Sequence, residues 1–250
     1  MMFHVKQLSE TQSQPDPLSS PVIRQTLAQN GICISEDQSR ALAKHAELVI
    51  QANREFNLTR ITDPADVLIL QVLDSALAID AVQATPRGQL VDIGSGAGYP
   101  GVVLAILTDR PTLLVESVRK KADFLSRVAF ELGLEVGVYA GRAEDLAREH
   151  AEEATCVVAR ALAPLPSIVE LAAPLLRHGG RLVAMKGCPG TDELVSGAAA
   201  ALQCGMRQVE VQNLGLSLEH RRALVIYERV GRPRVRLPRR IGLAQHAPLG

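Results

Sequence analysis

The segment 90–101, LVDIGSGAGYPG, constrains the fold most, because an apolar run stops abruptly in a glycine-rich turn. The turn contains Gly94, Gly96, Gly98 and Gly101, and a helical pattern follows it. Glycine has no Cβ, so such a turn adopts positive φ and lets backbone N–H groups approach a ligand, while the next helix directs its positive dipole end to the same place. The pattern therefore predicts a strand, a ligand-binding turn and a helix.

Two registers of these glycines predict different cofactors. The dinucleotide pattern G-x-G-x-x-G is satisfied by Gly96, Gly98 and Gly101, but its turn would begin three residues beyond the strand. The pattern D-x-G-x-G-x-G, with Asp92, Gly94, Gly96 and Gly98, begins where the strand ends. It resembles the first motif of S-adenosylmethionine-dependent methyltransferases, and it includes the Asp92 carboxylate, which needs partners inside an apolar strand. We favour this second register, with the dinucleotide register as the alternative.

Short β-rich runs alternate with helical patterns from residue 89 onwards. These runs are 90–93, 112–116, 134–139, 155–159, 181–186, 208–214 and 222–229. Such alternation predicts a parallel sheet with helices on both faces. The last two runs are joined by only seven residues, too few for a helical crossover, so we expect them to pair antiparallel. The predicted fold is α/β, with a doubly wound, mostly parallel seven-stranded sheet of the Rossmann-like class I methyltransferase type.

Helical signals precede the sheet. Ser35 and Gln38 form a capping box for one helix, and Asp63 precedes Pro64 as the N-cap of another, which we expect to continue to Leu77. The expected organisation is a flexible N-terminus, a helical extension, an S-adenosylmethionine-binding domain and a basic tail, at residues 1–20, 21–85, 86–230 and 231–250.

Positive charge is concentrated near the C-terminus. The whole chain has a formal net charge of zero, yet the stretch from Glu219 to Arg240 contains eight arginines and two glutamates. This distribution fits contact with phosphate, and a solvated tail that aids solubility is the alternative. Because aromatic residues make up only 3% of the chain, RNA recognition would have to rely on Arg and Lys.

The four cysteines lie far apart, without a C-x-x-C pair or a His cluster: Cys33, Cys156, Cys188 and Cys204. This spacing predicts neither a metal site nor a disulfide framework and favours a reducing, cytoplasmic compartment. No apolar run approaches the ~18 residues of a membrane span. A cysteine nucleophile would be Cys156, which we expect in the core, or Cys188, which lacks a nearby activating base.

Polar residues follow the predicted strands, at the edge where doubly wound sheets bind ligands. Glu116 ends the second strand, where a carboxylate can accept ribose hydroxyls. After the third strand, Ala143 can flank an adenine ring and Glu144 can meet its polar edge. Arg160 follows the fourth strand, where its charge needs a ligand carboxylate, an RNA phosphate or a structural ion pair. The Asn/Asp-Pro-Pro-Tyr/Phe sequence typical of exocyclic-amine methylation is missing after that strand.

With these residues assembled, the chain resembles the RsmG (GidB) family, bacterial methyltransferases that modify N7 of one guanine in the decoding-region loop of small-subunit (16S) ribosomal RNA. The resemblance covers about residues 30 to 250. It rests on Asn57-Leu58-Thr59 with Asp63-Pro64, Leu73-Asp74-Ser75, Asp92 to Gly101, Arg160-Ala161, Met185-Lys186-Gly187 and Pro238-Arg239-Arg240. Gln71 departs from the pattern, since the family often has His there.

The resemblance implies that S-adenosylmethionine is bound by residues of the turn and of the strand ends: Gly94, Tyr99, Ala143, Glu144 and Arg160. The glycine pattern adds Gly96 and Gly98, and the position after the second strand adds Glu116. Arg160 and Lys186 are expected to position the substrate at the cleft. The expected RNA contacts are Lys186, Arg221, Arg222, Arg239 and Arg240. Guanine N7 has a lone pair and no proton, so no general base and no metal are expected.

Three other functions remain open from the residues alone. A methyltransferase of the same fold could act on another RNA or on a small molecule, and a nicotinamide-dependent oxidoreductase would use the dinucleotide register. A ribosome-binding factor could keep the fold without catalysis. We expect the 16S rRNA or the small ribosomal subunit as partner and a monomeric protein.

Overall fold

The seven β-rich runs form one sheet in the order β3-β2-β1-β4-β5-β7-β6. The computed structural model describes residues 16–216 and 221–250, so residues 1–15 of the expected flexible N-terminus, and Glu219 in the basic stretch, lie outside the described residues. The strands are β1 (Leu90–Ile93), β2 (Thr112–Glu116), β3 (Val136–Ala140), β4 (Ala154–Arg160), β5 (Leu176–Lys186), β6 (Met206–Gly215) and β7 (Arg221–Arg229).

The direction of β7 distinguishes it from the other six strands. β1 pairs in parallel with both β2 and β4, and β4 pairs in parallel with β5. β7 lies antiparallel between β5 and β6, which confirms the expected pairing of the last two strands. From β1 the chain runs outward through β2 and β3, and it then returns to place β4 on the other side of β1. Ligands bind at such switch points in doubly wound sheets.

β5 begins five residues earlier than the sequence pattern predicts. Its first residue, Leu176, pairs with Ala154, and the register then shifts so that Arg181 pairs with Cys156. The intervening residues include Gly179 and Gly180, which interrupt the apolar alternation. A bulge therefore hides the start of this strand from a period-two pattern.

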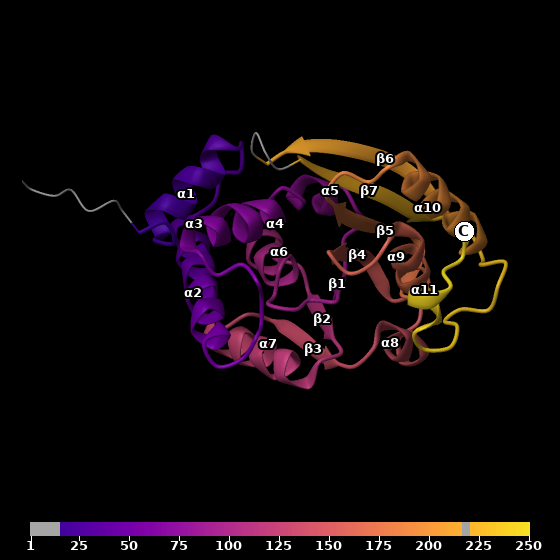
Figure 1. Ribbon diagram of the computed structural model, residues 1–250, viewed down its shortest axis with the longest axis horizontal. Coiled ribbons are helices and arrows are strands. Elements are labelled where there is room, and N and C mark those ends of the chain that lie inside the picture. Colours follow the sequence, from indigo (N-terminus) through magenta and orange to yellow (C-terminus); the bar gives the residue numbers. More distant parts are fainter. Residues whose placement is uncertain (1–15, 217–220) are drawn as a thin grey trace, which may run out of the picture.

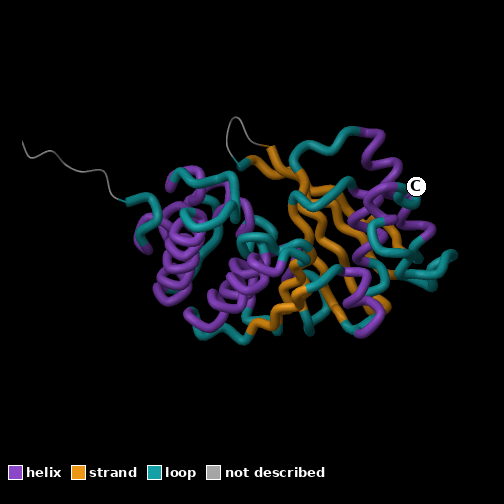
Figure 2. The backbone as a smooth tube through the Cα atoms, turned by 60° about the horizontal axis from the view of Figure 1, so that its bottom comes forward, coloured by secondary structure: helices purple, strands orange, loops and turns teal. Residues whose placement is uncertain are grey.

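Helices cover both faces of the sheet (Figure 1; Figure 2). One face carries α1 (Ser20–Gln29), α2 (Glu36–Asn53), α3 (Pro64–Asp66), the π-helix Val67–Leu73, α4 (Asp74–Ala76), α5 (Ile79–Gln83), α6 (Gly101–Thr108) and α7 (Arg119–Glu131). The other carries α8 (Ala143–Glu149), α9 (Leu165–Ala172), α10 (Thr191–Gln203) and α11 (Leu243–His246).

Burial of β1 on both faces explains its continuous apolar run. Val91 and Ile93 pack in the cluster on the α9 side, and Leu90 packs with Leu104 of α6 on the other side. Side chains alternate along a strand, so Asp92 projects to the same side as Leu90. A carboxylate is thereby placed beneath the beginning of α6.

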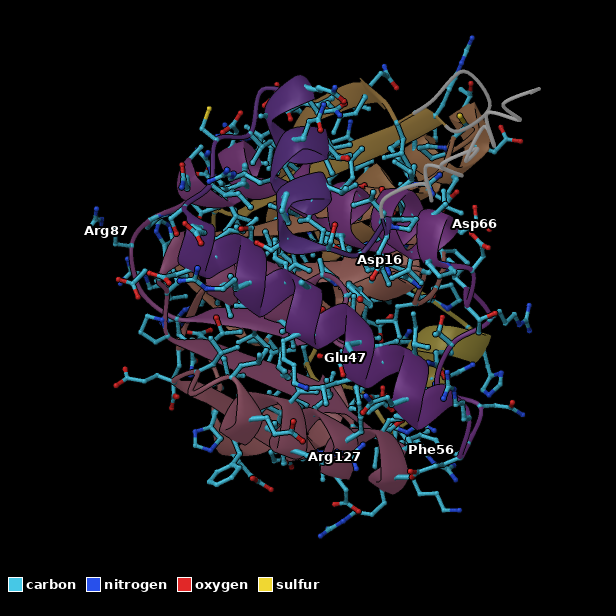
Figure 3. The ribbon with its side chains drawn as sticks, turned by 90° about the vertical axis from the view of Figure 1, so that its left-hand side faces the viewer. Asp16, Glu47, Phe56, Asp66, Arg87 and Arg127 are labelled. Atoms are coloured by element: carbon cyan, nitrogen blue, oxygen red, sulfur yellow. The ribbon has the colours of Figure 1, made fainter. Side chains whose placement is uncertain are left out.

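The helical extension packs against α6 and α7 through a shared apolar cluster. Figure 3 views this side, with Glu47 on the outer surface of α2 and Phe56 beyond its end. The capping box of α2 is present, because the Ser35 hydroxyl accepts from the Gln38 N–H and the Gln38 side chain accepts from the Ser35 N–H.

The helix expected from Asp63 to Leu77 is not uniform, which corrects that prediction. Asp63 caps it as expected, but Val67–Leu73 forms a π-helix between two short α-helical turns. The apolar spacing is compatible with either winding, so the sequence could not distinguish them. The widened turn carries Leu70 and Gln71 to the site described next, and π-helical turns often occur at functional sites.

Candidate functional site

A cavity of about 1170 Å³ lies at the carboxyl ends of β1, β4 and β5, beneath the helical extension. Its walls comprise the glycine-rich turn, the ends of those strands, the segment 57–61 and the π-helix. Among the predicted site residues, the lining includes Gly94, Gly96, Tyr99, Arg160, Lys186 and Arg222. The remaining predicted residues lie outside this lining: Gly98, Glu116, Ala143, Glu144, Arg221, Arg239 and Arg240.

The glycine-rich turn is held by Glu116. Gly94 and Gly96 have φ values of +77° and +55°, which residues with a Cβ adopt only with strain. The Gly96 N–H donates to Glu116 Oε2 at 2.9 Å, and the Val118 N–H donates to Glu116 Oε1 at 2.7 Å. The second strand thus ends in a buried carboxylate that fixes the shape of the turn.

The absence of a side chain at Gly98 allows α2 to pack closely against the glycine-rich turn. Its φ is +93°, and a Cβ there would lie 2.8 Å from Nε2 of His45 on α2. In the dinucleotide register this glycine would approach a pyrophosphate. In the structure it lies beneath the helical extension, outside the cavity lining, although both glycine registers include it.

Asp92 connects β1 to the beginning of α6. Its Oδ2 accepts from the Gly101 N–H at 3.0 Å, and a Cβ at Gly101 would lie 2.4 Å from that oxygen. Its Oδ1 has no hydrogen-bond partner in the part of the chain that the structure describes. Burial raises the pKa of Asp92 to about 7, although hydrogen bonds and Arg160 act in the opposite direction.

Arg160 makes the structural ion pair that the sequence left as one of its three alternatives. Its Nη1 donates to Asp74 Oδ2 at 3.0 Å and to the Leu70 carbonyl at 2.8 Å, and its Nη2 donates to Gln71 Oε1. The Arg160 guanidinium carbon also lies 5.8 Å from the centroid of the Tyr99 ring. The π-helix therefore holds this arginine over the aromatic ring that lines the cavity.

Asp74 joins two strands to the helical extension. Its Oδ1 accepts from Arg222 Nε at 2.9 Å, while its Oδ2 binds Arg160, and the residue is only 3% exposed. No role for Asp74 was predicted from the sequence. A carboxylate within an apolar helical run was the available signal, because a buried charge requires partners.

The cavity lining carries an excess of positive charge. In the described ranges 16–216 and 221–250, Asp74 is the one carboxylate among the lining residues, which also include Arg60, Lys121, Arg160, Lys186 and Arg222. Arg60 and Lys121 were not predicted, because neither follows a strand. An anionic ligand is the chemistry that such a lining favours.

Lys186 lines the cavity while paired with an acid. Its Nζ lies 2.7 Å from Glu193 Oε1 and donates to the Ala163 carbonyl at 3.0 Å. Burial pushes the pKa of Glu193 upward, but hydrogen bonds from Lys186 and the Leu165 N–H outweigh burial and lower it. The lysine is thus held at the end of β5.

The C-terminal tail folds back onto α8 and α9 (Figure 1). Arg239 donates from Nε and Nη2 to the two oxygens of Glu170, at 2.6 and 2.5 Å, and Glu170 is 3% exposed. Glu144, beside Ala143 at the beginning of α8, accepts from the Gly242 N–H at 2.9 Å. Arg239 therefore anchors the tail, whereas Arg240 is exposed.

Cys156 is buried, as the sequence predicts, whereas Cys188 is exposed. Within 16–216 and 221–250, no group of three His, Cys, Asp or Glu side chains could hold a metal ion. Burial raises the pKa of Cys156 to about 11, as fits a core thiol. Across the same ranges, no helix has both the length and the apolar character to span a membrane.

The chain is similar to known methyltransferases of small-subunit ribosomal RNA. The family model described as GidB, rRNA small subunit methyltransferase G, matches residues 38–225. The ribosomal RNA small subunit methyltransferase G of Pelotomaculum thermopropionicum is 38% identical over 235 residues, which cover 91% of this chain and 97% of the relative. That of Deinococcus radiodurans is 36% identical over 249 residues, covering 94% and 96%.

A solved structure shares the fold at low sequence identity. The geranyl diphosphate C-methyltransferase of Streptomyces coelicolor A3(2), in complex with Mg²⁺, geranyl diphosphate and S-adenosyl-L-homocysteine, superposes with a TM-score of 0.54 at 17% identity. The match covers 72% of this chain and 88% of that chain. This similarity agrees with the predicted class I methyltransferase architecture.

Proposed function

The chain belongs to the rRNA small subunit methyltransferase G family, and from this premise we propose that it methylates N7 of a single guanine in small-subunit ribosomal RNA. Membership makes it an S-adenosylmethionine-dependent methyltransferase of that RNA. The acceptor atom is the further step that we propose. The positively charged cavity beside the glycine-rich turn is the observation that carries the proposal.

The cavity fits S-adenosylmethionine. Its volume of about 1170 Å³ exceeds that of most small-molecule sites and leaves room for an acceptor base. Gly94 and Gly96 bring backbone close to the ligand, and Arg160 has the charge to meet a ligand carboxylate. The Tyr99 hydroxyl is buried without a hydrogen-bond partner among the described residues, so a ligand atom would satisfy it.

Two acidic residues complete the proposed cofactor site from the ends of β2 and β3. Each oxygen of Glu116 accepts one backbone N–H, and a carboxylate oxygen has a second lone pair with which to accept a ribose hydroxyl. Ala143 and Glu144 begin α8 and are proposed to meet the adenine ring. We leave Gly98 out of this site, because it packs against His45.

The reaction requires positioning rather than proton transfer. S-adenosylmethionine supplies a methyl group on a positively charged sulfur. The guanine N7 lone pair forms the new N–CH₃ bond as the S–CH₃ bond breaks, so the positive charge moves to the base and no proton is released. The task of Arg160 and Lys186 is to hold the RNA so that N7 and the methyl carbon approach to about 3 Å.

The proposed RNA surface surrounds the cavity. Lys186, Arg222, Arg60 and Lys121 line it, and Arg221 and Arg240 are exposed beyond it. Neutralising phosphates releases counterions, so binding weakens as salt rises. We expect Lys186→Ala to lower RNA affinity, the salt slope and turnover. The charge-matched control is Lys44→Ala on α2, because Lys44 is also partly buried and paired with an acid, Glu47. Unchanged values for Lys186→Ala would remove this residue from the surface.

Methyl transfer tests the proposal directly. Labelled S-adenosylmethionine is offered with small ribosomal subunits from cells lacking this protein, or with naked rRNA, and 7-methylguanine is mapped by chemical cleavage. Label at one guanine is expected, and the better substrate shows whether the assembled subunit is needed. Label on another atom would overturn the N7 assignment, and lack of transfer to either RNA would overturn the proposed activity.

We also propose that the enzyme acts as a monomer in the cytoplasm, the reducing compartment that its free cysteines favour. Sedimentation of the purified protein at working concentration tests the oligomeric state. A stable dimer would contradict this part of the proposal.

A further inference from the structure

A second cavity, of about 410 Å³, lies beside the first and has no role in the site described above. It is enclosed by the loop after β5, by α10 and by the facing ends of β6 and β7. Its lining residues are Cys188, Pro189, Leu194, Val211, Asn213, Leu214, Gly215, Arg221 and Arg222.

The two cavities are continuous along the chain and share a side chain. Lys186 and Gly187 line the large cavity, and the next two residues of the loop line the small one. Arg222 lines both, and its Nε is fixed by Asp74 at 2.9 Å. A polymer held in the large cavity would therefore pass this arginine on its way to the small one.

The lining of the small cavity combines an apolar wall with two cations. Pro189, Leu194 and Val211 provide surface against which a flat base can pack, and no carboxylate is among the lining residues that the structure describes. Arg221 and Arg222 provide charge for phosphate, and a guanidinium plane can also stack on a base. This arrangement complements a nucleotide better than it complements a neutral or cationic ligand.

We propose that the second cavity binds a nucleotide of the RNA substrate that neighbours the methylated guanine. The base lies against the apolar wall, and Arg221 and Arg222 meet the flanking phosphates. The inference rests on the proposed function and adds to it a subsite for RNA. It implies that the enzyme reads a stretch of single strand rather than one flipped base, since a base must be unstacked to enter.

Two exposed cysteines provide an internal test in the unmodified protein. Cys188 lines the second cavity, whereas Cys33 is exposed in the connection between α1 and α2. Rates of alkylation by iodoacetamide are measured at both thiols by mass spectrometry, for the protein alone, with S-adenosylmethionine, and with rRNA or small subunits. Buried Cys156 and Cys204 report any unfolding.

We expect RNA to slow alkylation of Cys188 by about tenfold or more and to leave Cys33 unchanged, and S-adenosylmethionine alone to change neither. Methyl transfer is measured in the same mixtures. If the RNA is methylated while Cys188 stays equally reactive, the subsite is wrong and the proposed function stands. If no RNA is methylated, the proposed function fails, and the subsite fails with it. Protection of Cys188 by S-adenosylmethionine alone would assign the cavity to the cofactor and overturn the inference.

A charge substitution tests the same subsite without the cysteine. Asn213→Asp places a carboxylate in the cavity at almost constant volume, and Gln212→Glu makes the same change on the neighbouring residue, outside the lining. We expect Asn213→Asp to raise KM for RNA about tenfold while KM for S-adenosylmethionine stays within about twofold, the scale of losing one nucleic-acid contact. Equal effects of the two variants would overturn the subsite.

Discussion

The ring of His45 lies against the ring of Tyr99, with centroids 4.5 Å apart, and His45 Nε2 donates to the Ala97 carbonyl at 2.9 Å. The carbonyl accepts, so Nε2 carries the proton and Nδ1 is left without a partner among the described residues. Burial lowers the pKa of His45 to about 4, against the effect of this hydrogen bond. A neutral histidine from the helical extension thus supports the glycine-rich turn.

Truncating this histidine should weaken both the fold and cofactor binding. His45→Ala removes a buried ring and leaves the Ala97 carbonyl unpaired, for an expected loss of about 2–4 kcal/mol in the free energy of unfolding. The Kd for S-adenosylmethionine, measured by calorimetry well below the Tm, should rise severalfold because the turn is released. His45→Phe, which keeps a ring but not the donor, should recover part of the stability. A wild-type Kd in the folded His45→Ala variant would contradict this role.

Substitution of Gly98 should be more costly than positive φ alone explains. An added Cβ would lie 2.7 Å from the Val102 side chain and 2.8 Å from His45. Gly133 also has positive φ, at +60°, but nothing lies within 4 Å of an added Cβ. Gly133→Ala should therefore cost about 1 kcal/mol, and Gly98→Ala more than about 2 kcal/mol, by chemical denaturation. The difference should shrink in a His45→Ala background, and equal costs would exclude the clash.

The dependence of stability on pH should reveal Asp92. Its pKa is raised from 3.8 to about 7 in the folded protein, so folding favours the protonated form. The stability that this proton contributes is complete below about pH 4 and is lost as pH rises toward 7. Asp92→Asn does not titrate, so the difference in unfolding free energy should shift toward the variant by up to about 1.4 kcal/mol per pH unit across that window. A difference that is flat from pH 4 to 7 would contradict the raised pKa.

Two adjacent arginines should separate tail anchoring from RNA binding. Arg239→Ala leaves Glu170 buried without its partner, for an expected loss of about 3 kcal/mol in stability and an unchanged salt slope of RNA binding. Arg240→Ala should leave stability unchanged and reduce the salt slope by about one. Thermal unfolding and binding titrations at several salt concentrations distinguish them. A reduced salt slope for Arg239→Ala would return that residue to the RNA surface.

Local signals sufficed for the parts of the fold that depend on neighbouring residues. β1 and β2 begin and end where the sequence predicts, because both are short apolar runs bounded by turn residues. The capping box at Ser35 and the cap at Asp63 are equally local. The start of β5 was missed because a bulge interrupts its pattern.

The side-chain contacts that the sequence did not predict join residues that lie far apart in the chain. Arg160 was placed at the ligand edge from its position after β4, but Asp74 lies 86 residues away. Glu170 is 69 residues from Arg239, so the anchoring of the tail left no local trace. Gly98 fits a ligand-binding motif, and only the approach of α2 shows that its missing Cβ makes room for His45.

Because β7 runs opposite to the other six strands, evolution can adjust recognition of the RNA acceptor separately from binding of S-adenosylmethionine. A parallel strand at that place would present its last residues to the ligand edge, whereas β7 presents its first, Arg221 and Arg222. The glycine-rich turn follows β1, far earlier in the chain than the first residues of β7. We therefore expect changes at Arg221, which lines the second cavity and not the first, to alter which acceptor is recognised and to leave the source of the methyl group untouched, a modular division within one continuous sheet.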